Sequence, residues 1–125
     1  MTEAPLELRI ETIGQTTVAI YPPDAPTIAT EADALDVIGA LYGSGVELVV
    51  FAVDRLSPAF FELRTGLAGA MLQKFQNYGL RVAILGDIGQ HTATSQALTD
   101  FVRETTRRGE VLFLADTAAL AERLR

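Results

Sequence analysis

The chain has 125 residues, of which 49% are hydrophobic and 21% are charged, and its formal net charge is -6. This composition is typical of a soluble globular protein, and the length is that of one domain, so we expect a single domain over residues 1–125. Nucleic acid is not expected as a partner, because phosphate binding needs clustered cations and the basic residues here are scattered. The absence of cysteine excludes disulfides, thiolate catalysis and sulfur-bound zinc.

The N-terminal stretch predicts no export signal, since MTEAPLELRIE has neither a basic segment nor an apolar one. No apolar run approaches the roughly 20 residues that a membrane-spanning helix needs. We therefore expect a cytoplasmic protein without a membrane span, and no cofactor.

Two strands and a stiff connector open the chain. Leu6–Ile13 alternates apolar and polar residues, and Thr16–Tyr21 forms a second apolar run after the turn at Gly14-Gln15. The pair is typical of a β-hairpin. Three prolines within residues 22–26 then prevent regular structure.

A helix and a buried strand follow. Thr30 and Asp33 have the spacing of a capping box, and apolar residues continue at helical intervals until the glycines of residues 43–45. Glu47–Val53 is almost continuously apolar and rich in β-branched residues, as in a strand covered on both faces. Asp54 ends it.

The central segment predicts a long helix followed by a strand. Ser57 can cap the helix, and Pro58 suits its first position because proline has no N–H to leave unpaired. Gly79 ends the helix, and the apolar strand Arg81–Leu85 leads to Asp87.

The last third predicts two more helices around one strand. A polar loop holding the only histidine, His91, precedes a helix capped near Ser95 and extending to Arg108. Val111–Ala115 is the final strand, and Asp116 caps the final helix.

The predicted order is ββαβαβαβα, an α/β domain with about four helices. A helix between successive later strands requires parallel pairing with right-handed crossovers. We therefore expect a mostly parallel five-stranded sheet with an antiparallel strand at one edge.

Two resemblances support this assignment. The segments FFELRTGLAGAMLQKFQNY and RVAILGD resemble the bacterial domain-of-unknown-function family numbered forty-one eighty, and matching positions extend from Ala32–Asp36 to Asp100–Glu104. This resemblance implies a family but no activity. The element order and the AILGD strand are also similar to STAS domains of anti-sigma-factor antagonists, which implies a STAS-like fold. In those domains a phosphorylatable serine often begins the helix after the third strand, where Ser57 stands; we interpret Ser57 as a helix cap.

Three carboxylates mark the carboxyl ends of three successive predicted strands: Asp54, Asp87 and Asp116. Open α/β sheets bind ligands at that edge, and clustered carboxylates can hold Mg²⁺. We favour the simpler interpretation that these residues occupy turns and a helix cap, so no metal is predicted. His91 is interpreted as an exposed loop residue, since no nucleophile motif accompanies it.

Arg64 is an unusual feature of the central helix. At 100° per residue it falls in the middle of a broad apolar arc, and an unpaired buried charge is costly. We therefore expect Arg64 to be largely buried and bonded to Asp87 or Asp54.

Gly66 and Gly69 fall on the opposite arc of that helix, beside Gln73. Each helical glycine costs about 1 kcal/mol relative to alanine, so two explanations remain open. Either another backbone approaches closely there, as in a homodimer, or the helix breaks between Gly66 and Gly69.

The resulting hypothesis is a non-enzymatic binding or regulatory module that acts through protein contacts, with Gly66, Gly69 and Gln73 at the interface. The alternative is a small-ligand domain that uses the carboxyl edge of the sheet; its candidate ligand-binding residues are Asp54, Arg64, Asp87 and His91. A hydrolase using Asp87 and His91 is the least favoured class.

Overall fold

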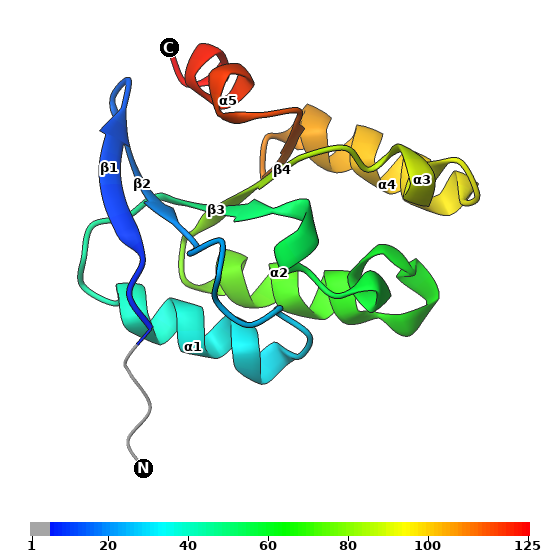
Figure 1. The fold of residues 1–125 in the computed structure, drawn as a ribbon, viewed down its shortest axis with the longest axis horizontal. Helices are drawn as coiled ribbons and strands as arrows, with labels where there is room; N and C mark the ends of the chain where they lie inside the picture. Colours follow the sequence, from blue (N-terminus) through cyan, green and yellow to red (C-terminus); the bar gives the residue numbers. More distant parts are fainter. Residues whose placement is uncertain (1–5) are drawn as a thin grey trace.

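The computed structural model describes residues 6–125, whose strands form one five-stranded sheet (Figure 1). The strands are β1 (Arg9–Ile13), β2 (Thr16–Ile20), β3 (Leu48–Ala52), β4 (Arg81–Leu85) and β5 (Val111–Leu114). They lie in the order β1-β2-β3-β4-β5, with β1 antiparallel to β2 and every other neighbouring pair parallel. The expected mostly parallel sheet with an antiparallel edge strand is confirmed.

Three helices connect the parallel strands: α1 (Glu31–Leu41), α2 (Leu67–Asn77) and α4 (Gln96–Arg108). A short helix, α3 (Gly89–Thr92), precedes α4, and α5 (Thr117–Arg123) follows β5. The predicted caps at Thr30, Ser95 and Asp116 are all present: each side chain accepts a hydrogen bond from the N–H three residues later. Local sequence signals therefore set where these helices begin.

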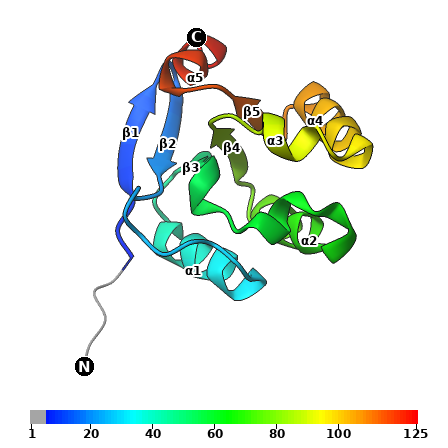
Figure 2. The same ribbon diagram turned by 45° about the vertical axis from the view of Figure 1, so that its right-hand side comes forward.

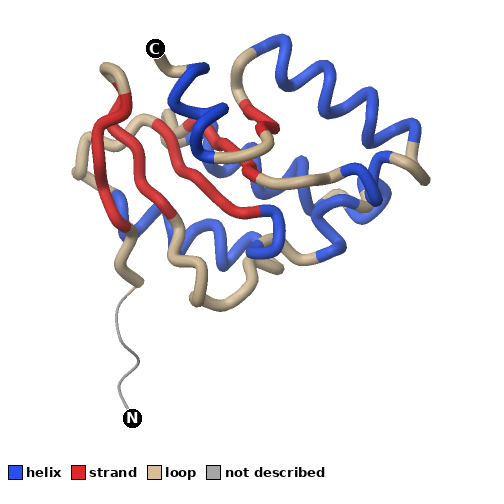
Figure 3. Tube along the Cα trace, turned by 45° about the horizontal axis from the view of Figure 1, so that its top comes forward, coloured by secondary structure: helices blue, strands red, loops and turns tan. Residues whose placement is uncertain are grey.

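The two faces of the sheet are covered unequally. Figures 1 and 2 show α1, α2 and α4 together on one face, where they cover the larger core cluster. The other face has a smaller cluster, in which Leu120 of α5 packs on sheet residues. In Figure 3 no helix lies in front of β1 or β2 on that face. The smaller cluster comprises Val18, Leu48, Val50, Ala83, Leu112 and Leu120.

The central helix is shorter than the sequence predicts. Two 3₁₀ turns, Pro58–Phe61 and Leu63–Thr65, precede α2, and Gly66 separates them from it with φ +76°. Of the two explanations for the glycines, the break is therefore confirmed at Gly66. A left-handed residue interrupts the α-helical hydrogen-bond ladder, and glycine adopts that conformation without the steric penalty of a Cβ.

Aromatic contacts tie the proline connector, the irregular segment of residues 21–30, to the core. The Tyr21 ring lies 5.3 Å from that of Phe51 on β3, and Phe51 lies 5.8 Å from Phe75 on α2. The Tyr21 hydroxyl donates to the carbonyl of Pro26 at 2.6 Å. Burial raises the pKa of Tyr21 above its ordinary value, so this hydroxyl stays protonated and able to donate. The connector is thereby held against the carboxyl end of β2.

The hairpin turn at Gly14 contacts the end of α5, which suggests a stability test. Gly14 has φ +64°, and an added Cβ would collide with the carbonyl oxygen of Leu124, whereas Gly43 has φ +77° with nothing within 4 Å. We expect Gly43→Ala to lower the free energy of unfolding by about 1 to 2 kcal/mol through backbone strain alone. Gly14→Ala should cost clearly more, because the hairpin must also move away from α5. Urea denaturation of both variants measures the difference, and equal costs would contradict the contact.

Candidate functional site

The three predicted carboxylates follow their strands as expected, but each is engaged locally. Asp54 Oδ1 lies 3.5 Å from Arg55 Nε, and Asp87 Oδ1 accepts the N–H two residues later at 2.7 Å. Asp116 Oδ1 caps α5 at 2.8 Å. Within residues 6–125 no group of three His, Cys, Asp or Glu side chains is placed to hold a metal ion. The carboxyl edge therefore presents separate acids rather than a cluster.

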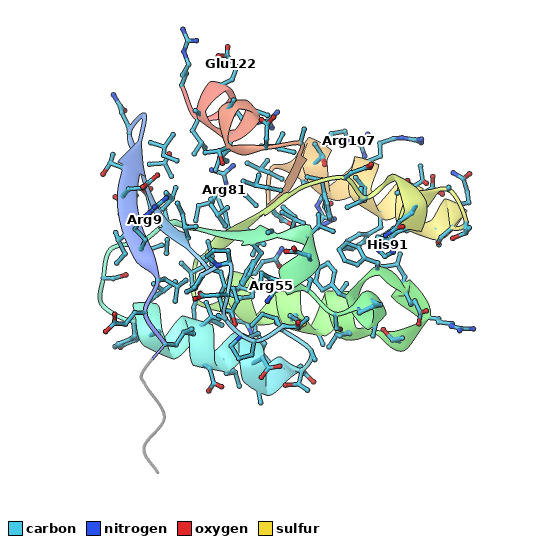
Figure 4. All side chains as sticks on the ribbon, in the orientation of Figure 1. Arg9, Arg55, Arg81, His91, Arg107 and Glu122 are labelled. Atoms are coloured by element: carbon cyan, nitrogen blue, oxygen red, sulfur yellow. The ribbon has the colours of Figure 1, made fainter. Side chains whose placement is uncertain are left out.

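The prediction that Arg64 is buried and paired with Asp54 or Asp87 is wrong. Arg64 lies on the second 3₁₀ turn with an exposed side chain, and it forms no ion pair with any of residues 6–125. The helix break explains the difference, because residues before Gly66 do not continue the apolar arc of α2. The arginine beside Asp54 is Arg55, which also donates from Nη1 to the carbonyl of Ala25 at 2.7 Å (Figure 4).

Ser57 does not act as the predicted side-chain cap. Its Oγ is buried and has no hydrogen-bond partner among residues 6–125. The N–H of Phe60 donates instead to the main-chain carbonyl of Ser57 at 3.0 Å, closing the 3₁₀ turn. Pro58 does take the first position of the turn, as expected.

His91 lies on α3 rather than in a plain loop. Its half-buried ring stacks on Phe61, with 4.3 Å between the ring centres and 12° between their planes (Figure 4). Arg64 and His91 line the same cleft of about 510 Å³, which we call the His91 cleft. Two of the four predicted ligand-binding residues thus come together, while Asp54 and Asp87 do not line this cleft. Its walls are Pro58, Phe61, Glu62, Leu63, Arg64, Gln90, His91, Thr94, Ser95 and Ala97.

A second depression, the α2–α4 groove, separates these two helices and has a volume of about 430 Å³. Gly69 and Gln73, two of the three predicted interface residues, line it from α2. Ala97 of α4 lines both this groove and the His91 cleft, so the two adjoin. Gly66 lies at the break before α2 and is not among the lining residues. The α2–α4 groove is lined by Gly69, Leu72, Gln73, Gln76, Ala97, Asp100, Phe101, Glu104, Thr105, Arg108, Glu110 and Val111.

A third depression, the open-face pocket, was missed by the sequence reasoning. It has a volume of about 530 Å³ and lies at the carboxyl ends of β2, β3 and β4, beside α5. Ile20, Val50, Ala52, Leu85 and Leu120 give it a largely apolar lining. The predicted element order could have indicated this pocket. When the crossover helices all lie on one face, only the short last helix is available to cover the other face.

These features define a mixed α/β domain with three crossover helices on one sheet face and depressions between helices and on the opposite face. The family model described as "Domain of unknown function (DUF4180)" matches residues 13–124, and the chain belongs to this family. No curated protein and no solved structure matches it. The STAS-like resemblance therefore stays a prediction, while the family prediction is confirmed. Within residues 6–125 no helix has both the length and the apolar character needed to cross a membrane.

Two serines at helix starts provide a matched stability test. Ser57→Ala removes a buried hydroxyl that has no partner within residues 6–125, so we expect the free energy of unfolding to stay the same or rise slightly. Ser95→Ala removes an Oγ that accepts the N–H of Leu98 at 3.1 Å and should cost about 1 kcal/mol. Thermal and urea denaturation compare the two. A larger loss for Ser57→Ala would show that its hydroxyl does form a stabilising hydrogen bond.

Two arginines allow a second comparison. Arg64→Met should change the free energy of unfolding by no more than about 0.5 kcal/mol, because the side chain is exposed and unpaired within residues 6–125. Arg55→Met removes a charged donor from the Ala25 carbonyl, and we expect a loss of about 1 to 2 kcal/mol. Urea denaturation at neutral pH measures both losses. A larger loss for Arg64→Met than for Arg55→Met would contradict this assignment and support the predicted buried ion pair of Arg64.

Proposed function

We propose that this chain is a cytoplasmic, non-enzymatic binding module and that the α2–α4 groove receives a segment of a protein partner. The observation that carries the proposal is that each of the two helices places one small residue in the groove, Gly69 from α2 and Ala97 from α4. Gly69 on α2 and Ala97 on α4 are both exposed, and neither side chain can fill the space between the helices.

Gly69 supports an external contact more than an internal one. A Cβ built on it would meet nothing within 4 Å, so packing within the described chain does not require a glycine there. Glycine inside a helix costs about 1 kcal/mol relative to alanine. Gly39 on α1 has the same cost, so what distinguishes Gly69 is its place in the α2–α4 groove, where a partner backbone could approach α2 closely.

The remaining lining has the layout of a binding surface. Leu72 and Val111 are buried beneath the groove and Phe101 is half-buried, so its floor is apolar. Polar residues surround this floor, and some are already held in place: Gln76 Nε2 donates to Glu110 Oε2 at 2.7 Å. An apolar centre with a polar rim is typical of protein interfaces. The partner segment should therefore present a small apolar side chain to the floor.

An enzymatic function has less support. General acid–base chemistry would need His91 within hydrogen-bond reach of a nucleophile or an acid. Its ring stacks instead on Phe61, and Asp87 accepts a hydrogen bond from the main chain of Gly89. The hydrolase alternative therefore gains no supporting pair of side chains.

A small apolar ligand is the second candidate, and the open-face pocket favours it. Its volume of about 530 Å³ lies in the range of roughly 300 to 1,000 Å³ that small-molecule sites occupy. It also lies at the carboxyl ends of parallel strands, where α/β sheets bind ligands. Native mass spectrometry of the chain purified from its own host should then show a retained apolar molecule. Substituting Ala52→Phe, which narrows the pocket, should release it; retention in that variant would contradict the assignment.

The partner groove is tested by placing a photoreactive amino acid at Gln73, with Gly39 on the exposed side of α1 as the control position. Irradiation in the native host should couple a partner to position 73 and not to position 39. The coupled protein, identified by mass spectrometry and purified, should bind the wild-type chain. We expect Gly69→Leu, which fills the groove, to weaken that affinity at least about tenfold, equivalent to roughly 1.4 kcal/mol.

Gly39→Leu is the matched control substitution, because this helical glycine also has nothing within 4 Å of a built Cβ. Both leucines should leave the fold intact, since each replaces glycine by a better helix former. Equal effects of the two substitutions on affinity, or no coupling specific to position 73, would contradict the proposed groove.

A further inference from the structure

We propose that β1 is a self-association edge: it pairs antiparallel with β1 of a second copy about a twofold axis at Ile10. The two sheets would then form one continuous sheet. This surface is separate from the α2–α4 groove, and the inference does not depend on the proposed function. Figures 1 and 2 show β1 as the edge strand of the sheet, with no further strand of residues 6–125 on its outer side.

The hydrogen bonds of β2 show which groups β1 presents at this edge. The N–H of Glu47 donates to the Thr17 carbonyl, and the N–H of Tyr21, just after β2, donates to the Val50 carbonyl, both at 2.9 Å. The main-chain groups of residues 17 and 21 therefore point toward β3. Thr17 is opposite Thr12 in the antiparallel ladder, and facing residues there alternate between bonded and non-bonded pairs.

The N–H and C=O groups of Thr12 and Ile10 must therefore point away from β2, as must those of Leu8 just before the strand. Among residues 6–125 no main-chain or side-chain partner bonds them. Unpaired edge groups of this kind are templates for another strand, and Arg9–Ile13 lacks the proline that often blocks such pairing.

The strand is complementary to itself in one register. With Ile10 opposite Ile10 of the second copy, each Arg9 faces a Glu11 across the axis, and Leu8 faces Thr12. In this register the two Ile10 residues form main-chain hydrogen bonds with each other, and each Leu8 forms them with Thr12 of the other copy. Arg9 and Glu11 form the non-bonded pairs, where side chains lie closest and opposite charges stabilise pairing.

Side-chain exposure agrees with this register. Ile10 is 49% exposed, which is high for a large apolar side chain in a strand, and pairing would bury it against its symmetry mate. The Arg9 and Glu11 side chains are 73% and 39% exposed and lie 3.3 Å apart within one chain (Figure 4 labels Arg9), so they can exchange partners across the axis. Moving the centre to Glu11 would instead place two carboxylates opposite one another.

Charge reversal tests the register. Sedimentation velocity over a range of concentrations should show a reversible dimer for the wild-type chain. Arg9→Glu and Glu11→Arg each place like charges opposite one another at two positions, and we expect each to weaken the dimer by about tenfold or more. The double variant restores opposite charges and should recover the wild-type dissociation constant to within about threefold. Arg103→Glu is the control: it changes the net charge by the same amount as Arg9→Glu, but at an exposed position on α4, and it should leave the dimer unchanged.

A second variant tests the main-chain pairing. Ile10→Pro removes an N–H that points outward, so the β1–β2 ladder and the circular dichroism spectrum should persist while the dimer is lost. A wild-type chain that stays monomeric at every concentration would overturn the proposal. So would a double charge variant no more dimeric than the single ones, a dimer that survives Ile10→Pro, or a dimer abolished by Gly69→Leu, which would place the interface on α2.

Discussion

The handedness of the crossover connections determines most of this structure. The strands follow one another across the sheet in sequence order, and β2 to β5 are parallel. Right-handed crossovers that always step in the same direction must place every connecting helix on the same face. The opposite face is therefore covered by a helix of residues 6–125 only where the short α5 packs on it. β1 has no crossover helix and joins the sheet only through the hairpin with β2. The open-face pocket is a consequence of this constraint, whereas the free edge results from the hairpin, which places β1 outside β2.

On the helix-covered face, the carboxyl ends of the strands are covered by the pairing of two irregular segments. Ile28 of the proline connector bridges to Leu56; its N–H donates to the Arg55 carbonyl at 2.7 Å, and its carbonyl accepts from Ser57 at 2.9 Å. The following 3₁₀ turn buries Phe60 and Phe61. Main-chain pairing and two aromatic rings thus take the place of the helical turn expected there. This segment covers the carboxyl ends on the helix side only, Asp54 stays exposed, and Phe61 forms part of the His91 cleft.

Sequence patterns were sufficient for the elements of the fold and for most of their ends. Alternation and apolar runs located all five strands, and the caps at Thr30, Ser95 and Asp116 placed three helix starts within a residue. These signals are local, so they persist whatever the tertiary packing. Gly66 is different, because the pair Gly66 and Gly69 was compatible with two outcomes and no local pattern distinguished a broken helix from a continuous one.

Arg64 shows why the candidate site was harder to predict. Its expected burial depended on extending a 100° rotation per residue through the whole central segment, but a 3₁₀ turn advances by about 120° and a left-handed residue resets the phase. The α2–α4 groove was also beyond local patterns, since it depends on how far apart two helices lie on the sheet. Gly69 was predicted at an interface because a helical glycine is costly wherever the helix packs, and Gln73 because it lies on the same arc. The residues of α4 that complete the groove carried no such signal.

The two surfaces proposed for binding lie at opposite ends of the sheet, and this makes them compatible. β1 forms one edge, while the α2–α4 groove is lined by Val111 at the start of β5, the strand at the other edge. Pairing two copies through β1 would leave both grooves unobstructed, one toward each end of the continuous sheet. A partner with two copies of its binding segment would then engage the second groove at a high effective concentration, so that modest affinity at each groove would suffice for a stable complex. Dimerisation through β1 would in this way strengthen partner binding without any contact between the two sites.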